Sequence, residues 1–185
     1  MYKLCKTEQS AARQRQLELG LLQCMLSRRY EEISISDLCE QMQIPRKSFY
    51  RYFSSKDGAL FALLDHTMLE FYKEGFRNSG EGKPMGDLDA FFVFWHARRD
   101  VLDALERSGL SGILVERATA LAQKERLVPA LINSWSADLQ QIAMSFAICG
   151  LLSMVIQWHH NGYRVSPKEM SQVAKAMLTR PLIPI

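Results

Sequence analysis

Helical spacing of apolar residues is the feature of this sequence that most limits its fold. Apolar side chains recur three and four positions apart through most of the 185 residues, whereas the sustained apolar and polar alternation of strands is nearly absent. Turn and capping residues divide this pattern into segments. We therefore predict an all-α protein with about nine helices, at 7–29, 37–42, 46–53, 56–77, 87–107, 111–124, 129–134, 137–160 and 166–180.

The composition is that of a soluble globular protein that needs neither metal nor disulfides. Hydrophobic residues make up 48% and charged residues 23% of a chain long enough to bury a sizeable core. The net charge of +3 is too small to indicate nucleic acid by itself. No CxxC pair and no histidine at a metal-ligand interval accompanies the four cysteines, so we predict no metal and no cofactor.

Two segments of the sequence bear on where in the cell the protein is found. The N-terminus lacks the apolar core and the cleavage site of a signal peptide, which predicts a cytoplasmic protein. The most apolar stretch, 142–156, contains Ser145 and Gly150 and is shorter than the ~20 residues of a membrane span. We expect no membrane contact and predict that this stretch is a helix buried against protein.

The segment 34–53 has the spacing of a helix-turn-helix. Ser34 and Asp37 form the pattern of a capping box, and Pro45 ends one helix and begins the next. In the second helix, Phe49 and Phe53 share one face and point inward. The outward residues are Lys47, Ser48, Tyr50 and Arg51. Such a face suits a DNA major groove, although the same residues on their own are more typical of a solvated helix.

A longer pattern favours DNA. Residues 33–60 resemble the DNA-binding signature of the TetR family of bacterial transcriptional regulators, in which a short helix is followed by a turn, a Phe/Leu-Tyr-x-His/Tyr-Phe run, a lysine and a leucine. The resemblance implies a sequence-specific regulator, a repressor released from its operator by a small-molecule effector. It implies a helix-turn-helix domain at 1–54, a connecting helix at 55–77, and an effector-binding and dimerisation domain at 87–185.

The resemblance also implies roles for individual side chains. The implied base contacts are Ser36, Arg46, Lys47, Ser48 and Arg51. The implied phosphate contacts are Ser34, Tyr50, Tyr52 and Lys56. Two residues depart from the family pattern. Gln43 replaces a glycine, which predicts a residue with positive φ, and Pro45 replaces a capping serine, on which the tilt of the reading helix depends.

The second half is similar to the family in its last two helices, which in those proteins pack against their copies in a second subunit. The resemblance therefore implies a homodimer. Small residues that permit close helix approach support this interface, although the same helix could be the core of one subunit. The predicted interface residues are Ala143, Ala147, Gly150, Met154 and Trp158.

The family's effector pocket lies among the helices of this half. The aromatic cluster at 91–96 supplies Phe92, Trp95 and His96 as candidate ligand contacts for an unknown small molecule, with core packing as the alternative.

Two other functions compete with a DNA-binding regulator. A helical enzyme would need Cys149, His96, Asp100 and His159 to assemble a nucleophile and a base, and no spacing supports this, so we predict no catalytic residue. A co-activator that binds another regulator would keep the fold, but it would not need the basic helix face.

Overall fold

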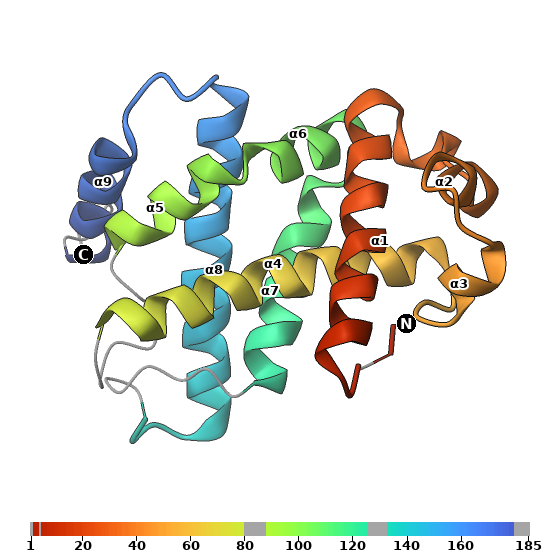
Figure 1. The fold of residues 1–185 in the computed structure, drawn as a ribbon. Coiled ribbons are helices and arrows are strands. Elements are labelled where there is room, and N and C mark those ends of the chain that lie inside the picture. The colour runs from red at the N-terminus through yellow and green to blue at the C-terminus, as the bar shows by residue number, and fades with distance from the viewer. Residues whose placement is uncertain (1, 4, 80–87, 126–132, 180–185) are drawn as a thin grey trace. The chain divides into compact units, whose positions relative to one another are not determined.

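A computed structural model describes residues 2–3, 5–79, 88–125 and 133–179 (Figure 1). Within these ranges the regular structure is helical, apart from one isolated bridge between Tyr2 and Phe53. It comprises α1 (Glu8–Ser27), η1 (Tyr30–Glu32), α2 (Ile35–Gln41), α3 (Arg46–Tyr50), α4 (Lys56–Ser79), α5 (Leu88–Ala97), α6 (Arg99–Arg107), α7 (Ser111–Lys124), α8 (Ala137–His160) and α9 (Pro167–Thr179). The all-α prediction is confirmed.

The contacts divide the chain into two units. The first unit is Met1–Thr67 with Asp100–Ile113, and the second is Met68–Arg99 with Leu114–Ile185. The division lies inside α4, so this helix belongs to both units and α6 belongs to the first. The domain boundaries predicted from the sequence, at residue 54 and at the two ends of the connecting helix 55–77, do not coincide with this division.

The single helix predicted at 87–107 is wrong, because the chain breaks at Arg98 into α5 and α6. No glycine or proline marks the break, and the apolar spacing continues through it. The Arg98 guanidinium pairs with Glu70 at 2.8 Å and lies 5.1 Å from the Phe94 ring centroid. The break coincides with the boundary between the two units, so the halves bury their apolar faces in different cores. The helix predicted at 129–134 falls largely outside the described residues.

The core of the first unit forms where α1, α2, α3 and the start of α4 meet. Phe49 and Phe53 are both fully buried, with ring centroids 5.2 Å apart. Each contributes about 2–3 kcal/mol by leaving water. Leu21, Leu38 and Leu60 are equally buried and come from three other helices. The inward face predicted for α3 is thus confirmed, and its burial fixes which side of the helix remains exposed.

A buried carboxylate joins α1 to α4 in the same unit. Glu18 is completely buried, accepts a hydrogen bond from Arg15 Nη1 at 3.0 Å, and lies 2.9 Å from Nδ1 of His66 on α4. Arg15 also donates to the Leu63 carbonyl at 3.4 Å. Removing one partner of such a buried pair costs roughly 3–5 kcal/mol, because a charge is then left uncompensated. The orientation of α1 is therefore set by polar as well as apolar contacts.

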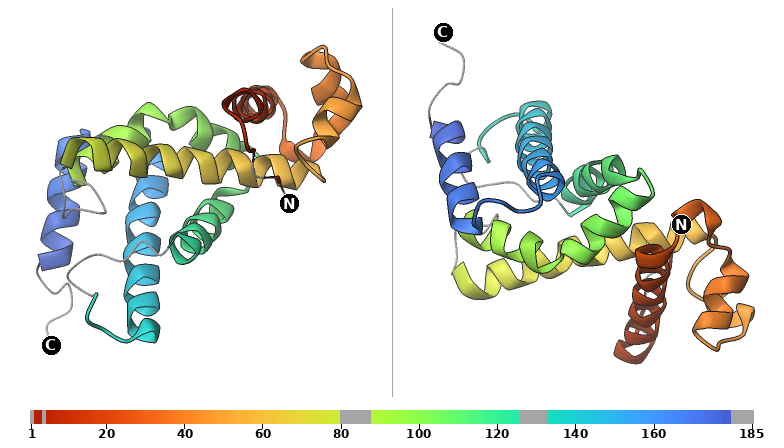
Figure 2. Two further views of the ribbon diagram at one scale, coloured as in Figure 1. Left: turned by 60° about the horizontal axis from the view of Figure 1, so that its bottom comes forward. Right: turned by 90° about the horizontal axis from the view of Figure 1, so that it is seen from above.

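In the second unit, α5 and α9 lie side by side, as Figures 1 and 2 show. Helix α8 has 24 residues, as many as α4. One face of α8 is buried, whereas Ile142 and Phe146 are 66% and 74% exposed on the other. Within the described ranges, α8 is also the one helix long and apolar enough to span a bilayer, and only 28% of its most apolar window is buried. The outer face of this stretch is therefore not buried within its own chain, and whether other protein covers it stays a prediction.

Candidate nucleic-acid interface

The start of α2 is fixed by the predicted capping box. Ser34 Oγ accepts a hydrogen bond from the Asp37 N–H at 3.1 Å, and the Asp37 carboxylate accepts one from the Ser34 N–H at 2.9 Å. The bonds from the Ser34 backbone and hydroxyl hold the pKa of Asp37 below its ordinary value, because they favour the charged carboxylate. Ser34 and Ser36 are both exposed here.

The turn between α2 and α3 contains both departures from the family pattern. Gln43 has φ of 54°, which confirms the predicted positive φ. The Ile44 N–H donates to the Cys39 carbonyl at 2.9 Å and closes the turn. Pro45 precedes the first residue of α3 and gives no side-chain cap. The second helix is held by these backbone bonds, and it is shorter than the predicted 46–53.

The outer face of α3 is basic. Arg46, Lys47 and Arg51 are exposed, Tyr50 is 43% exposed, and Ser48 is half-buried. Among the described residues no carboxylate pairs with any of these three cations. The Arg46 guanidinium does donate to the Tyr50 hydroxyl at 3.4 Å. Guanidinium and ammonium groups that lack a carboxylate partner are available to phosphate oxygens and to the acceptors of guanine.

Lys56 does not share that face. Its ammonium donates to the carbonyl oxygens of Tyr30 at 2.5 Å and Ile33 at 2.6 Å, and lies 4.1 Å from the Tyr30 ring centroid. The Tyr30 hydroxyl donates to Asp57 at 2.5 Å, and burial together with this carboxylate raises the pKa of Tyr30 well above its ordinary value. The phosphate contact expected of Lys56 does not fit this placement, because the ammonium joins the start of α4 to the segment before α2.

Tyr52 is also less accessible than the sequence suggested, at 8% exposed. Its backbone carbonyl accepts a hydrogen bond from the Lys3 N–H at 3.0 Å. Its side chain lines a polar hollow between the first turns of α1 and the end of α3. We call this feature the α1–α3 hollow; its lining residues are Thr7, Gln9, Ser10, Arg13, Ser48, Arg51 and Tyr52. The α1 members of this set were not predicted, since nothing in the sequence relates the start of α1 to α3.

Comparison with known proteins supplies the fold. No family model and no curated protein matches the sequence. Among solved structures, the fatty acid degradation regulator FadR from Bacillus halodurans superposes with a TM-score of 0.62 at 13% identity, over 97% of this chain and 98% of its own. AlkX from Dietzia sp. strain DQ12-45-1b, a TetR family repressor implicated in n-alkane biodegradation, gives 0.54 at 19% identity, over 89% and 92%. The chain has the TetR-type regulator fold.

The dihydroxyacetone kinase operon activator DhaS is similar as well, with a TM-score of 0.58 at 15% identity over 90% of this chain and 93% of its own. The fold expected from residues 33–60 is thus confirmed. The roles of individual residues in this TetR-type chain stay predictions.

The second unit of the TetR-type fold contains an apolar cavity of about 220 Å³ among α4, α5, α7, α8 and α9. Trp95 lines it, together with Phe91 and Tyr72. The other two candidate ligand residues do not. Phe92 and His96 pack instead against Trp158, with ring centroids 5.9 and 5.5 Å away. Of the three candidates on α5, Trp95 thus faces this cavity and the other two face Trp158, and a role in ligand binding stays a prediction.

Among the described residues that line this cavity, none carries a charged side chain. Tyr72 supplies a hydroxyl, and burial raises its pKa above the ordinary value, so the phenol remains a neutral donor. A ligand that enters this space therefore meets apolar walls and at most a few hydrogen-bonding groups.

The residues predicted for the dimer interface are distributed over different sides of α8. Trp158 is 3% exposed and donates from Nε1 to the Val165 carbonyl at 2.9 Å, so its packing lies within its own subunit. Ala147 lines the cavity, and Ala143 is half-buried. Gly150 and Met154 line an open groove between α8 and α9. The stripe of small residues thus runs along the edge of the outer face.

The outer face itself is made of larger side chains. Leu139, Ile142 and Phe146 on α8 are each more than half exposed. Val173, Met177 and Leu178 on α9 are 50%, 41% and 55% exposed. The spacing of three and four residues in α8 contained this signal, and the interface prediction took the small residues of the helix in place of these larger ones.

Proposed function

We propose that this chain is a sequence-specific DNA-binding transcriptional regulator that acts in the cytoplasm as a homodimer. The observation that carries the proposal is the outer face of α3, next to a capped α2. Arg46, Lys47 and Arg51 are exposed on this face, and no carboxylate of the described residues pairs with them. In a TetR-type fold, this is the helix that can enter a major groove.

The contacts fall into two groups. We assign base reading to Ser36, Arg46, Lys47, Ser48 and Arg51. We assign phosphate contacts to Ser34 and Tyr50, whose hydroxyls lie on exposed residues of α2 and α3. Lys56 leaves the second group and becomes a residue that positions α4 relative to the η1 segment.

The homodimer is supported by the outer face of α8. An exposed set of large apolar side chains on a soluble chain indicates a surface that is covered in the assembled protein. A second copy of α8 and α9 would cover Ile142 and Phe146 and would present two reading helices to two half-sites, as helix-turn-helix dimers do.

The cavity supports an uncharged, largely apolar effector. Its volume of about 220 Å³ exceeds the ~150 Å³ that accommodates benzene in an engineered cavity, which indicates a ligand of one or two rings or a medium alkyl chain. Two proteins with a similar fold are FadR, a fatty acid degradation regulator, and AlkX, a repressor implicated in the biodegradation of n-alkanes. We propose that such an effector releases the chain from DNA, so that the regulator is a repressor. Activation is the alternative, because DhaS is an activator with this fold.

Selection from a random pool of DNA duplexes tests the function directly. The wild-type chain should enrich one palindromic sequence, and Lys47→Ala should shift the selected bases, whereas Arg107→Ala, on the exposed side of α6, should select the wild-type sequence. Absence of any enriched sequence would refute the proposal. Binding to a partner regulator with no affinity for DNA would favour the co-activator.

A further inference from the structure

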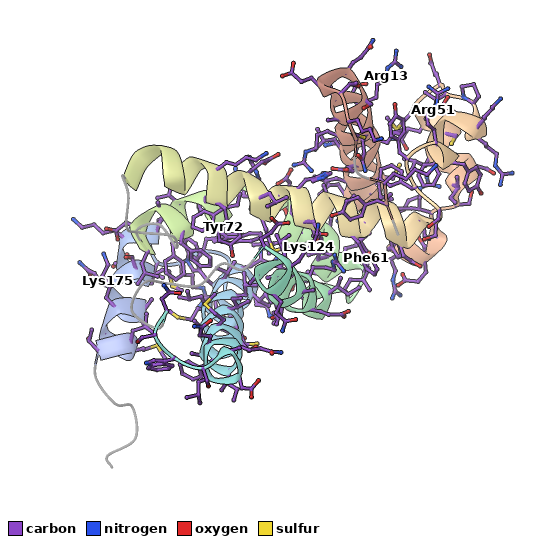
Figure 3. All side chains as sticks on the ribbon, turned by 90° about the horizontal axis from the view of Figure 1, so that it is seen from below. Arg13, Arg51, Phe61, Tyr72, Lys124 and Lys175 are labelled. Atoms are coloured by element: carbon purple, nitrogen blue, oxygen red, sulfur yellow. The ribbon has the colours of Figure 1, made fainter. Side chains whose placement is uncertain are left out.

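The α1–α3 hollow has the composition of an anion site. Its volume is about 360 Å³, and it is mainly polar. Arg13 comes from α1 and Arg51 from the end of α3, and Figure 3 labels both on these neighbouring elements. Both side chains are exposed, and neither has a carboxylate partner among the described residues. Two guanidinium groups thus border one hollow without a counter-ion.

The backbone adds to this positive potential. The hollow includes Thr7 and Ser10, which cap the 20-residue helix α1, and the first turn of a helix leaves N–H groups that attract anions. Glu8, the acid in that turn, is exposed and does not line the hollow.

Tyr52 places a polar group in the hollow. Its side chain is nine-tenths buried and lines the hollow, and its hydroxyl forms no hydrogen bond with any described residue. The hydroxyl is not among the enclosed polar atoms that lack a partner in the described part of the chain, so it is open to the hollow. A phenol O–H that is fixed by a buried ring and open to the hollow can donate to an anion there.

We propose that the α1–α3 hollow binds one backbone phosphate of the DNA duplex, with Arg13 and Arg51 as its cationic contacts and the Tyr52 hydroxyl as a neutral donor. The proposal rests on the proposed DNA-binding function, and it moves Arg51 from the base contacts to the phosphate contacts. A phosphate offers several acceptor oxygens, which match two guanidinium groups and a phenol. Ser48 and Arg51 belong to the hollow and to the reading face of α3, so the bound phosphate borders the groove that α3 enters. The start of α1 then becomes part of the DNA interface.

Variants of Arg13 and Tyr52 test the site. Affinity for the selected duplex is measured against salt concentration for the wild type, Arg13→Gln, Tyr52→Phe and the control Arg107→Gln. Loss of one phosphate contact lowers the slope of log K against log salt by about 0.9. Arg13→Gln should show this loss and Arg107→Gln should not. Tyr52→Phe should weaken binding about three- to tenfold and leave the slope unchanged, because it removes a neutral hydrogen bond.

Duplexes with a single neutral methylphosphonate identify the phosphate. Scanned along both strands, one position in each half-site should weaken binding by the wild type and have no further effect on Arg13→Gln. Equal effects on the two proteins at every position would overturn the proposal, and so would unchanged affinity and slope in Arg13→Gln.

Inorganic phosphate separates a DNA site from a site for a free anion. If millimolar phosphate raises the melting temperature of the wild type and not of Arg13→Gln, while the two bind DNA alike, the hollow binds free phosphate and the proposal fails. If the wild type itself binds no duplex, the proposed function fails first.

Discussion

Replacement of Lys56 by methionine separates two roles for the start of α4. Methionine keeps the length and apolar stem of the side chain and removes the ammonium, which donates to the Tyr30 and Ile33 carbonyls and lies over the Tyr30 ring. A hydrogen bond to a charged group contributes about 1.5–3 kcal/mol, and a cation–π contact about 0.5–1 kcal/mol at an exposed site. Lys56 is only partly buried, and water replaces some of these contacts. We expect a loss of roughly 2–4 kcal/mol.

Urea unfolding followed by circular dichroism measures this loss. The midpoint for Lys56→Met should fall with little change in the slope, since the surface exposed on unfolding is nearly the same. The melting temperature should fall by roughly 5–15 °C for a chain of this size. Lys47→Met is the matched control. Its side chain is exposed on α3, so its stability should change by less than about 0.5 kcal/mol.

The same two variants are compared on DNA at a temperature where both are folded. The salt dependence of DNA binding should be the same for Lys56→Met as for the wild type, because the ammonium is engaged inside the unit. If Lys56→Met kept wild-type stability and lost about 0.9 from the slope of log K against log salt, the lysine would be a phosphate contact and the inward geometry would be refuted.

Three further outcomes follow from the structure. Gln43→Gly should raise the free energy of unfolding by about 1 kcal/mol, because glycine adopts the positive φ without a Cβ clash; a lower urea midpoint would contradict this. Replacing Ile142 and Phe146 together by serine should give a monomer in light scattering with weakened DNA binding, and an unchanged mass would count against the α8 interface. The pKa of Tyr30 is raised in the folded chain, so the unfolded chain loses the Tyr30 proton first as the pH rises above the ordinary tyrosine value of about 10. The free energy of unfolding is therefore unaffected by this group below that pH and falls above it. Tyr30→Phe should therefore lose less stability between pH 9 and 11 than the wild type, roughly the range in which free tyrosine titrates, and parallel losses would refute the assignment.

Local signals account for what the sequence could predict. The capping box of Ser34 and Asp37, the positive φ of Gln43 and the inward pair Phe49 and Phe53 all depend on residues within a few positions of one another. Caps, turns and helical faces are set by such short-range chemistry, so most of the helices and the turn before α3 could be inferred from the residues alone.

What the sequence could not predict depends on distant partners. The direction of Lys56 is decided by carbonyl groups at Tyr30 and Ile33, and no pattern around Lys56 reveals them. The break at Arg98 occurs inside a continuous apolar pattern, where the two halves join different units. Arg13 lies in a different helix from Arg51, and only the folded chain brings both to one hollow.

The membership of α4 in both units has a thermodynamic consequence. Met68, Phe71 and Tyr72 of this helix line the cavity, and Lys56 at its start is bonded to the segment before α2. If an effector acts through this shared helix, the coupling free energy between effector binding and DNA binding is the same whichever of the two binds first. Bound DNA must then lower the protein's affinity for the effector by the same factor by which the effector lowers its affinity for DNA. An effector assayed without operator would show its highest affinity, and operator added to that assay reports the coupling.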